Sequence, residues 1–473
     1  MSNWQLVKLG SVTTKVGSGA TPRGGKVSYK SAGISLIRSQ NVHFDGFRDE
    51  GLAFLDDDQA EALKSVEVRA DDVLLNITGA SIGRVTTAPY RMSGARVNQH
   101  VCIIRPKPEL SPSYLRWYLA SPHVQHFIFD IQTGVTRQAL TKDQILAFSV
   151  PLPPLEIQER VVSEIEKQFS RLDEAVSALK RIQANLKRYK AAVLKAAVEG
   201  KLTEQWRKGH PDVEPADQLL KHILAERRAK WEAEELAKMK AKGIKPKDDS
   251  WKKKYKEPAG PDTANLPELP EGWVWVRLGA LPVDVFDGPF GSNLKSTDYV
   301  SSGVRVIRLE NIGSLEFIDG KVSFVTEQKY EQLKKHTVGH GDIIFSSFVA
   351  NETRVVILPG HIKKAINKAD CFCVRINDVA INKRYIETFL ATRTAYEQLV
   401  GDVHGATRPR INTTQLKDCH ISMPSIAEQN EIVSEIDRRL SVTEELETTI
   451  ETNLKRAERL RQTILSKQFH ITK

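Results

Sequence analysis

The chain has 473 residues, which exceeds the size of one ordinary hydrophobic core, so we expect two or three domains. Lys and Arg number 69 against 59 Asp and Glu; the net charge of +10 suits a polyanionic partner, although a basic enzyme of small molecules would look similar. The 4 cysteines form no disulfide framework and indicate buried thiols in a reducing cytoplasm. The first residues lack the features of a signal peptide, and no apolar run reaches about 18 residues, so we expect a cytoplasmic protein without a membrane partner.

Most of the chain consists of two similar copies. The stretch WQLVKLG (4–10) returns as WVWVRLG (273–279), and GISLIRSQNV (33–42) returns as GVRVIRLENI (303–312). Further along, GVTRQALTKDQI (134–145) returns as GATRPRINTTQL (405–416). The offset stays near ~270 residues, which indicates one internal duplication with small insertions instead of a solenoid of short repeats.

Each copy begins with a globular domain, which we place at 1–152 and at 272–424. Short β-like runs such as GISLIR and DDVLLNIT are separated by Gly, Pro, Asn and Asp, a pattern typical of an α/β (α+β) or mostly β domain. We expect short helices near 113–130 and 383–399.

A long amphipathic helix follows each domain, over 153–200 and over 425–473. Apolar residues recur at steps of three and four, from Ile157 to Val193 and from Ile432 to Ile464, which puts them on one stripe of each helix. Each helix would run for roughly 40 residues, or about 60 Å. Two such stripes most simply bury each other as an antiparallel coiled coil with a pseudo-two-fold axis. The alternative is that each helix packs only on its own domain.

The segment 201–271 has no equivalent after the second helix, and we expect a charged helical connector there. It holds a helical stretch at 216–242 and a Lys-rich run, KPKDDSWKKKYKEP (245–258). The motif WKKKYK could contact phosphates with aromatic support. A solvated linker explains the same composition, and we favour that interpretation.

Motifs of catalysis are missing from the sequence. The stretch GSGATPRGGK (17–26) fails as a phosphate-binding loop, because Val27 follows its lysine where Ser or Thr is required. We find no dinucleotide-binding or metal-ligand spacing either. These observations favour a duplicated, non-catalytic binding protein with no metal site and no cofactor of its own.

The order of the segments resembles the specificity subunit of Type I restriction-modification systems. The resemblance rests on an ordered set: a globular domain, PLPPLEIQ (151–158), a long helix, EGKLTEQWR (199–207), LPELPEGWVWVRLG (266–279), a second domain, PSIAEQ (424–429) and a second helix. It covers nearly the whole chain. GATP (19–22) also fits the start of a first recognition domain, whereas the second copy departs from it with GPFGSN (288–293).

The resemblance implies that each globular domain is a target recognition domain for double-stranded DNA. The two domains would read the halves of an asymmetric, two-part target separated by a non-specific gap. The subunit would dock two methyltransferase (modification) subunits, and two motor-nuclease (restriction) subunits would complete the complex. S-adenosylmethionine, ATP and Mg²⁺ would belong to those partners, and adenine methylation and restriction would be their activities.

Base edges are read by Arg, Lys, Asn, Gln, Ser and Thr side chains, so loops rich in these residues hold the candidate DNA contacts. In the first domain the candidates are Thr21, Arg23, Lys26, Arg38, Gln40, Asn41, Thr78, Ser81, Arg84, Asn98, Gln99, His100, Thr136, Arg137 and Gln138. In the second domain they are Ser292, Asn293, Lys295, Arg308, Glu310, Asn311, Ser346, Ser347, Asn351, Arg354, Asn367, Lys368, Thr407, Arg408 and Arg410.

Candidates shared by the two copies should serve common tasks, either phosphate contact or domain structure. We therefore predict that changing Arg137 or Arg408 weakens binding to all sequences and lowers its salt dependence. Candidates that differ between the copies, such as Gln40 and Glu310, are better choices for base reading, and changing them should relax discrimination at one half-site. For each residue a structural role is the competing interpretation; Asn41, for example, could cap a turn.

Two other classes of function compete with DNA recognition. One is a coiled-coil scaffold whose globular ends bind proteins, and the other is a nuclease or methyltransferase with an unrecognised motif. A gapped motif enriched from randomised duplexes would separate the first from DNA recognition, and cleavage or methyl transfer by the purified chain would reveal the second.

Overall fold

The structure is a computed structural model that describes residues 4–22, 24–132, 139–246, 248–401 and 409–469. It divides into two compact units, one formed by Met1–Ile182 with Thr449–Lys473 and the other by Gln183–Thr448. Among the described residues, none of the helices combines the length and the apolar character needed to cross a membrane. All four cysteines are buried and free, as the sequence indicated.

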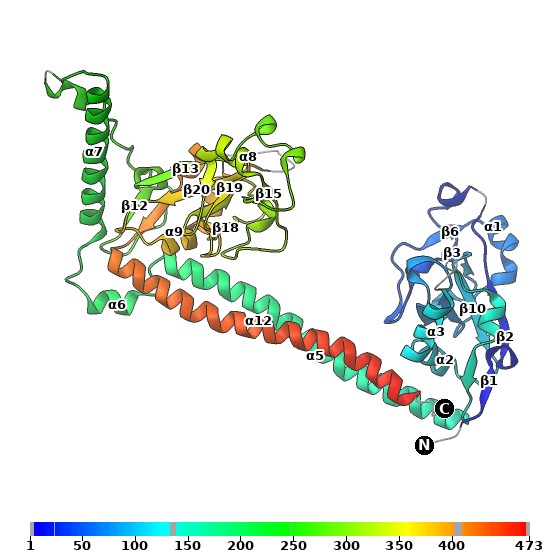
Figure 1. Ribbon diagram of the computed structural model, residues 1–473. Helices are drawn as coiled ribbons and strands as arrows, with labels where there is room; N and C mark the ends of the chain where they lie inside the picture. Colours follow the sequence, from blue (N-terminus) through cyan, green and yellow to red (C-terminus); the bar gives the residue numbers. More distant parts are fainter. Residues whose placement is uncertain (1–3, 23, 133–138, 247, 402–408, 470–473) are drawn as a thin grey trace. The chain divides into compact units, whose positions relative to one another are not determined.

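The first unit contains a four-stranded antiparallel sheet in the order β2-β10-β7-β8, a three-stranded sheet in the order β6-β3-β9, and the pairs β1-β11 and β4-β5 (Figure 1). The strands are β1 Leu6–Lys8, β2 Thr13–Ser18, β3 Ile34–Ile37, β4 Val42–His43, β5 Gly46–Phe47, β6 Ala53–Leu55, β7 Val73–Asn76, β8 Val85–Thr87, β9 Arg96–Val97, β10 Val101–Pro106 and β11 Ser149–Pro151. The α-helices are α1 Asp57–Ala62, α2 Pro112–Leu119, α3 Pro122–Gln132, α4 Lys142–Leu146 and the beginning of α5 Leu155–Val198.

The second unit repeats this topology. Its antiparallel sheet has the order β13-β20-β17-β18, its second sheet has the order β15-β14-β19-β16, and β12 pairs with β21. The strands are β12 Val274–Arg277, β13 Val283–Phe286, β14 Val304–Ile307, β15 Phe324–Val325, β16 Thr337–Val338, β17 Ile343–Ser346, β18 Val355–Ile357, β19 Ala365–Asn367, β20 Cys371–Ile376 and β21 His420–Met423. The α-helices are α6 Glu204–Gly209, α7 Ala216–Ala241, α8 Glu327–Gln332, α9 Lys383–Leu390, α10 Arg393–Val400, α11 Thr413–Asp418 and most of α12 Ile426–Gln468.

The duplication read from the sequence is therefore a duplication of the fold. Each expected short helix proves to be a pair, α2 with α3 and α9 with α10. The break falls where a polar residue ends one helix and caps the next. In the second copy, for example, the Thr392 hydroxyl accepts a hydrogen bond from the Ala395 amide at the start of α10.

One buried ion pair recurs at the same place in both domains. The Arg105 guanidinium donates two hydrogen bonds of 2.7 Å to the Asp72 carboxylate, and Arg375 binds Asp342 in the same bidentate way at 2.8 and 2.7 Å. Each pair joins the long central strand, β10 or β20, to the turn before its neighbour. Removal of the arginine would leave the buried carboxylate without a compensating charge, which is strongly destabilising.

The helix entrances PLPPLEIQ and PSIAEQ are also buried polar joints. The Gln158 side chain accepts from the Ser111 amide at the start of α2 and donates to the Pro153 carbonyl. Gln429 accepts from the Asn382 amide at the start of α9 and donates to the Pro424 carbonyl. Both glutamines are 0% exposed. The repeated motif therefore ties each long helix to its own domain.

Helices α5 and α12 pack together, as expected. In the first unit Phe169 and Leu465 share the domain's core, and Arg461 forms an ion pair with Asp173. In the second unit Val193 and Ile436 lie in the core, and Lys190 binds Glu447 at 2.6 Å. Burial along the predicted stripe is incomplete, since Ile182 is 46% and Leu446 is 45% exposed.

The segment 201–271 contains the helical stretch that the sequence predicted, as α7, whereas its Lys-rich run is more ordered than the solvated linker that we favoured. Glu428 of α12 accepts hydrogen bonds from the Thr203 hydroxyl at 2.6 Å and from the Trp273 indole at 2.9 Å, and it pairs with Arg207. The Lys-rich run contains a short 3₁₀ helix, η7 Asp249–Lys254, and its Trp251 is buried. Composition alone concealed this structure because few apolar residues anchor it.

Candidate nucleic-acid interface

Four of the candidate residues meet at one edge of the antiparallel sheet in the first domain. β2 and β7 end at this edge and β10 begins there, since Cys102 pairs with Ser18 and Val101 with Asn76. The polar residues just beyond these strands form a chain of hydrogen bonds: Thr21 to Gln99, Gln99 to His100 at 3.1 Å, and His100 to Thr78 at 2.5 Å. We call Thr21, Thr78, Gln99 and His100 the first rim.

The second domain carries a different cluster at the equivalent edge. The Ser347 hydroxyl donates to the Asp370 carboxylate at 3.0 Å, and the Asp370 amide donates to the Asp287 carboxylate at 3.0 Å. The Arg410 guanidinium lies 3.6 Å from the Asp370 carboxylate and 4.2 Å from the centre of the Phe348 ring. We call Asp287, Ser347, Phe348, Asp370 and Arg410 the second rim.

Electrostatics distinguish the second rim. Burial raises the pKa of the Asp287 carboxyl to about 6, and the nearby Asp370 charge also raises it, while hydrogen bonds from the Gly288 and Asp370 amides oppose the rise. Asp370 has a φ of 71°, in the left-handed region that few non-glycine residues adopt. The two neighbouring carboxylates, one of them with a raised pKa, make this edge a candidate functional site.

Several candidates prove to be structural. Asn41 and Asn311 are 0% exposed, and each side chain joins three backbone groups of its own loop. Arg38 lies over the Tyr29 ring, and Arg308 lies over the Tyr299 ring. The side-chain polar groups of Asn41 and Asn311 are thus occupied by the domain's own backbone.

Burial also limits other candidates. Asn98, Asn367, Ser346 and Ser347 are buried. Asn98 accepts from the His100 amide and supports the first rim, and Ser347 donates to Asp370 and supports the second. Arg354 donates to the Leu309 carbonyl at 3.1 Å and to the Ser346 hydroxyl at 3.2 Å. These partners indicate support of the loops instead of direct contact with bases.

The remaining described candidates keep accessible polar groups. Gln40 is exposed and donates to the Gly51 carbonyl at 2.8 Å, whereas Glu310 pairs with Arg308 at 3.1 Å. The others are half-buried or exposed, namely Ser81, Ser292, Asn293, Lys295, Asn351 and Lys368. Seven candidates lie outside the described residues or have side chains outside the description, namely Arg23, Lys26, Thr136, Arg137, Gln138, Thr407 and Arg408.

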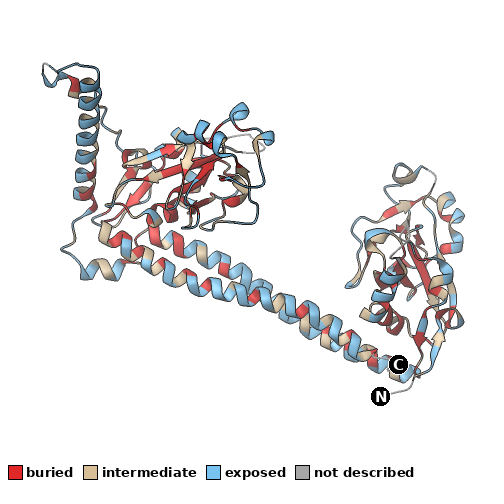
Figure 2. Ribbon diagram, in the orientation of Figure 1, coloured by how far each residue is buried: buried red, intermediate tan, exposed pale blue. Residues whose placement is uncertain are grey.

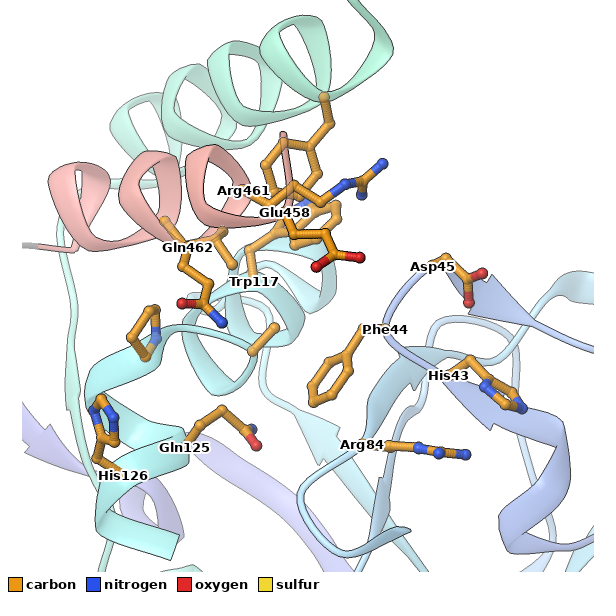
Figure 3. Close-up of a pocket in the computed structure, with 14 residues that line it drawn as sticks. His43, Phe44, Asp45, Arg84, Trp117, Gln125, His126, Glu458, Arg461 and Gln462 are labelled. Carbon is orange, nitrogen blue, oxygen red and sulfur yellow. The ribbon is translucent and has the colours of Figure 1, made fainter. Parts of the chain in front are cut away.

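Arg84 lines a separate cleft of about 610 Å³ in the first unit (Figure 3). Its walls come from the β4–β5 turn, from α2 and α3, and from the last turns of α12. Trp117 and Phe169 supply apolar surface, and Glu458 and Arg461 supply charge. This cleft lies where the domain meets its helix pair. Arg84 therefore belongs to the cleft and not to the first rim.

Sequence reasoning missed Asp287, Phe348 and Asp370. The selection favoured residues that donate to bases, and two of these three are acidic. A usable signal was present, because the second copy inserts one residue between its matching strands, at INKADCFCVR (366–375). Among the described residues no cluster of three His, Cys, Asp or Glu side chains could hold a metal ion.

Comparison with known proteins agrees with this architecture. A family model described as the Type I restriction modification DNA specificity domain matches residues 1–188 and 270–456. The chain belongs to this family. It is a DNA specificity subunit of a Type I restriction-modification system with two target recognition domains, and it is itself non-catalytic.

Relatives match over nearly the full length. The chain is 20% identical to the Type I restriction enzyme EcoKI specificity subunit of Escherichia coli strain K12, over 98% of this chain and 88% of the relative. It is 28% identical to the EcoAI specificity subunit of Escherichia coli, over 62% of this chain and 46% of the relative. These matches confirm the family that the ordered motifs predicted.

Solved structures share the fold. A chain from a structural study of complex assembly and conformational transition of the type I R-M system matches with a TM-score of 0.62 at 18% identity, over 98% of this chain and 97% of that one. The HsdS subunit of Thermoanaerobacter tengcongensis matches with a TM-score of 0.52 at 18% identity, over 99% and 97%. The predicted α/β domains with two long helices are thus confirmed.

Proposed function

We propose that the two rims read the two halves of an asymmetric DNA target separated by a non-specific gap. The observation that carries the proposal is that the same edge of the same sheet bears different chemistry in the two domains. Thr, Gln and His side chains offer both donors and acceptors to base edges. Asp accepts from cytosine and Arg donates to guanine, so the second rim suits other bases.

We infer the roles of the partner subunits from the family. This chain would direct adenine methylation and restriction by partner subunits in the cytoplasm. Two methyltransferase subunits would bring S-adenosylmethionine, and two motor-nuclease subunits would bring ATP and Mg²⁺. Apolar side chains left exposed on the helix pair, among them Ile182 and Leu446, support docking of partner subunits there.

Selection from randomised duplexes tests the proposal. We expect the full chain, assembled with its methyltransferase subunits, to enrich a gapped motif of two unlike halves, and methylated adenines in genomic DNA to fall within it. Enrichment of no motif would favour the protein-binding scaffold. Cleavage or methylation by the chain alone would instead reveal an enzyme.

The helix pair provides a second test, because α5 and α12 each run unbroken from one compact unit into the other. Insertion of one helical turn, about 5.4 Å, into both helices should change the preferred gap by one or two base pairs of about 3.4 Å. The insertions belong between Asp173 and Lys190 in α5 and between Glu447 and Arg461 in α12, where two ion pairs mark the register. An unchanged gap would refute the role of the helices as a spacer.

A further inference from the structure

The second unit carries an arm with no counterpart in the first copy. It consists of α7 and the returning segment 248–257, which contains η7. In Figure 1 the carboxyl-terminal half of α7 stands apart from the sheets of the second domain. The duplication does not require this arm, so its features need their own explanation.

The base of the arm is firmly attached. Leu219 and Ile223 of α7 lie in the core of the second unit. Figure 2 shows buried residues on the turns of α7 nearest the second domain. The Arg227 guanidinium donates to the Gly279 and Ala280 carbonyls, both at 2.7 Å. These contacts attach the amino-terminal half of α7 to the domain, and the rest of the helix extends from it.

The tip of the arm is folded as well. Trp251 is 7% exposed and stacks on Trp231 with 6.1 Å between ring centroids, and Tyr255 lies 5.3 Å from the Trp231 ring. Between the two segments, Arg228 of α7 pairs with Glu257 at 3.3 Å, and the Lys252 ammonium lies 3.9 Å from the Glu232 carboxylate of α7. These contacts bring the returning segment back along the end of α7.

Folding back concentrates lysines from two segments. The end of α7 and the turn after it contribute Lys238, Lys240, Lys242 and Lys245, and the returning segment contributes Lys252, Lys253, Lys254 and Lys256. A hydrogen bond from Lys238 lowers the pKa of Glu235, and the charges of Lys254 and Lys242 lower it further, so lysines of both segments surround one carboxylate. Lys242, Lys253 and Lys254 are exposed, and no ion pair of the described residues reaches them.

From this geometry we propose that the arm binds the phosphates of duplex DNA beside the target, independently of sequence and on one flank only. The proposal goes beyond base reading and rests on the chain's role in DNA recognition. Lysine ammonium groups neutralise phosphates without the forked geometry that reads guanine. The aromatic rings of the tip pack on one another, which leaves them unavailable for stacking on unpaired bases, so a duplex suits the tip better than a single strand.

Helix electrostatics alone does not account for the cluster. Lys238 and Lys240 lie in the last turn of α7, where a cation is favourable for any helix. Lys253 and Lys254 also lie in a last turn, but it belongs to the 3₁₀ helix η7, which spans only Asp249–Lys254 and offers far fewer aligned peptide dipoles than α7. Attraction to an external polyanion explains both groups together.

The test compares two triple variants of the full chain assembled with its methyltransferase subunits. The arm variant carries Lys242→Gln, Lys253→Gln and Lys254→Gln. The control variant carries Lys201→Gln, Lys208→Gln and Lys221→Gln, at the base of the same connector, where each lysine already pairs with a carboxylate. Both variants lose the same charge, so they separate position from net charge.

Binding is measured by fluorescence anisotropy at several salt concentrations, on duplexes trimmed to the selected target or extended on one side. We expect the wild-type complex to bind the duplex extended on one particular side more tightly than the trimmed duplex or the duplex extended on the other side. The arm variant should bind this extended duplex about tenfold more weakly, with a salt slope smaller by roughly 3, since each of the three phosphate contacts contributes about 0.9. Affinity for the trimmed duplex and the ratio of target to non-target binding should stay unchanged, and Lys→Arg at the same three positions should retain wild-type binding.

Three outcomes would overturn the proposal. The first is an equal loss in the control variant, which would show an effect of net charge. The second is an equal loss on the trimmed duplex. The third is unaltered DNA binding by the arm variant. If that variant also fails to assemble with the methyltransferase subunits, the arm is a surface for protein binding instead. In each case target discrimination would still report on the rims, so failure of the arm and failure of base reading remain distinguishable.

Discussion

The two recognition domains share their buried polar joints and differ at their rims. Asp72 with Arg105 matches Asp342 with Arg375, and Gln158 matches Gln429. At the edge of the sheet, however, a Thr–His–Gln network in the first domain stands where the second has paired carboxylates and an arginine. The difference teaches that duplication preserved the residues that hold the scaffold, whereas the polar residues at this edge of the sheet differ between the two copies.

The largest effect should come from breaking the shared clamp. Arg105→Met leaves the Asp72 carboxylate, whose side chain is 1% exposed, without its partner, and should lower the free energy of unfolding by about 3–5 kcal/mol. Arg375→Met should cost less, because Arg375 is 35% exposed and water reaches that clamp. Chemical denaturation of each variant measures the two losses.

Surface ion pairs provide the controls for the clamp. Arg91→Met removes an exposed pair with Asp49, and Arg393→Met removes one with Glu397. Both should change the free energy of unfolding far less than the clamp variants do, because exposed ion pairs are screened by solvent. Losses as large as those of the clamp variants would mean that burial does not decide the effect.

Somewhat smaller losses should follow from changes at the helix entrances. Gln158→Ala and Gln429→Ala each leave buried backbone groups without a partner and should lower the free energy of unfolding by about 2–3 kcal/mol. Equal losses, measured by chemical denaturation, would show that the two joints contribute equally to stability. The exposed neighbour Glu159→Ala serves as the control. A loss in only one domain would show that the shared motif serves different tasks.

Changes in the rims should affect specificity instead of stability. His100→Gln should alter discrimination only in the half-site read by the first domain, and Asp370→Asn only in the other half. Asn tolerates the φ of 71° at position 370. Each change should amount to about 1–3 kcal/mol at one base, measured by competition between duplexes with single substitutions. Altered discrimination in both halves after one substitution would contradict the assignment of one rim to each half.

The smallest effect should be a pH dependence of stability that arises from Asp287 in the second rim. Because the pKa of Asp287 is raised from 3.8 to about 6, the folded state favours its protonated form. This contribution to stability is complete below about pH 3.8 and is lost as the pH rises through about 6. Asp287→Asn keeps an acceptor for both amides and removes the charge, so the melting temperature should exceed that of wild type at pH 8 and match it near pH 4.

Asp319 provides a control of opposite sign. The Arg305 guanidinium lowers the pKa of this carboxyl, so the ionised form stabilises the fold and Asp319→Asn should lower the melting temperature at pH 8. The difference in melting temperature between Asp319→Asn and wild type should shrink as the pH falls through the lowered pKa of Asp319. A raised melting temperature for both variants at pH 8 would show a general effect of removing acidic charge.

Much of the architecture could be predicted from the sequence because it depends on local periodicity and on self-similarity. The steps of three and four after Pro154 predict a long helix over 153–200, and α5 spans Leu155–Val198. The matching β-like runs reveal the duplication by simple self-comparison of the chain. Individual site residues could be predicted less well. Asn41 and Gln40 are neighbours with similar side chains, yet one is 0% exposed and the other is exposed, and only the path of the loop separates them.

The sequence by itself determined the family, the two domains and the two long helices, since ordered motifs and hydrophobic spacing survive without knowledge of long-range contacts. Only the tertiary structure decided which polar residues face solvent at the sheet edge. It also showed that the Lys-rich run after α7 folds back on Trp231. Both depend on contacts between residues far apart in the chain, and such contacts leave no periodic signal in the sequence.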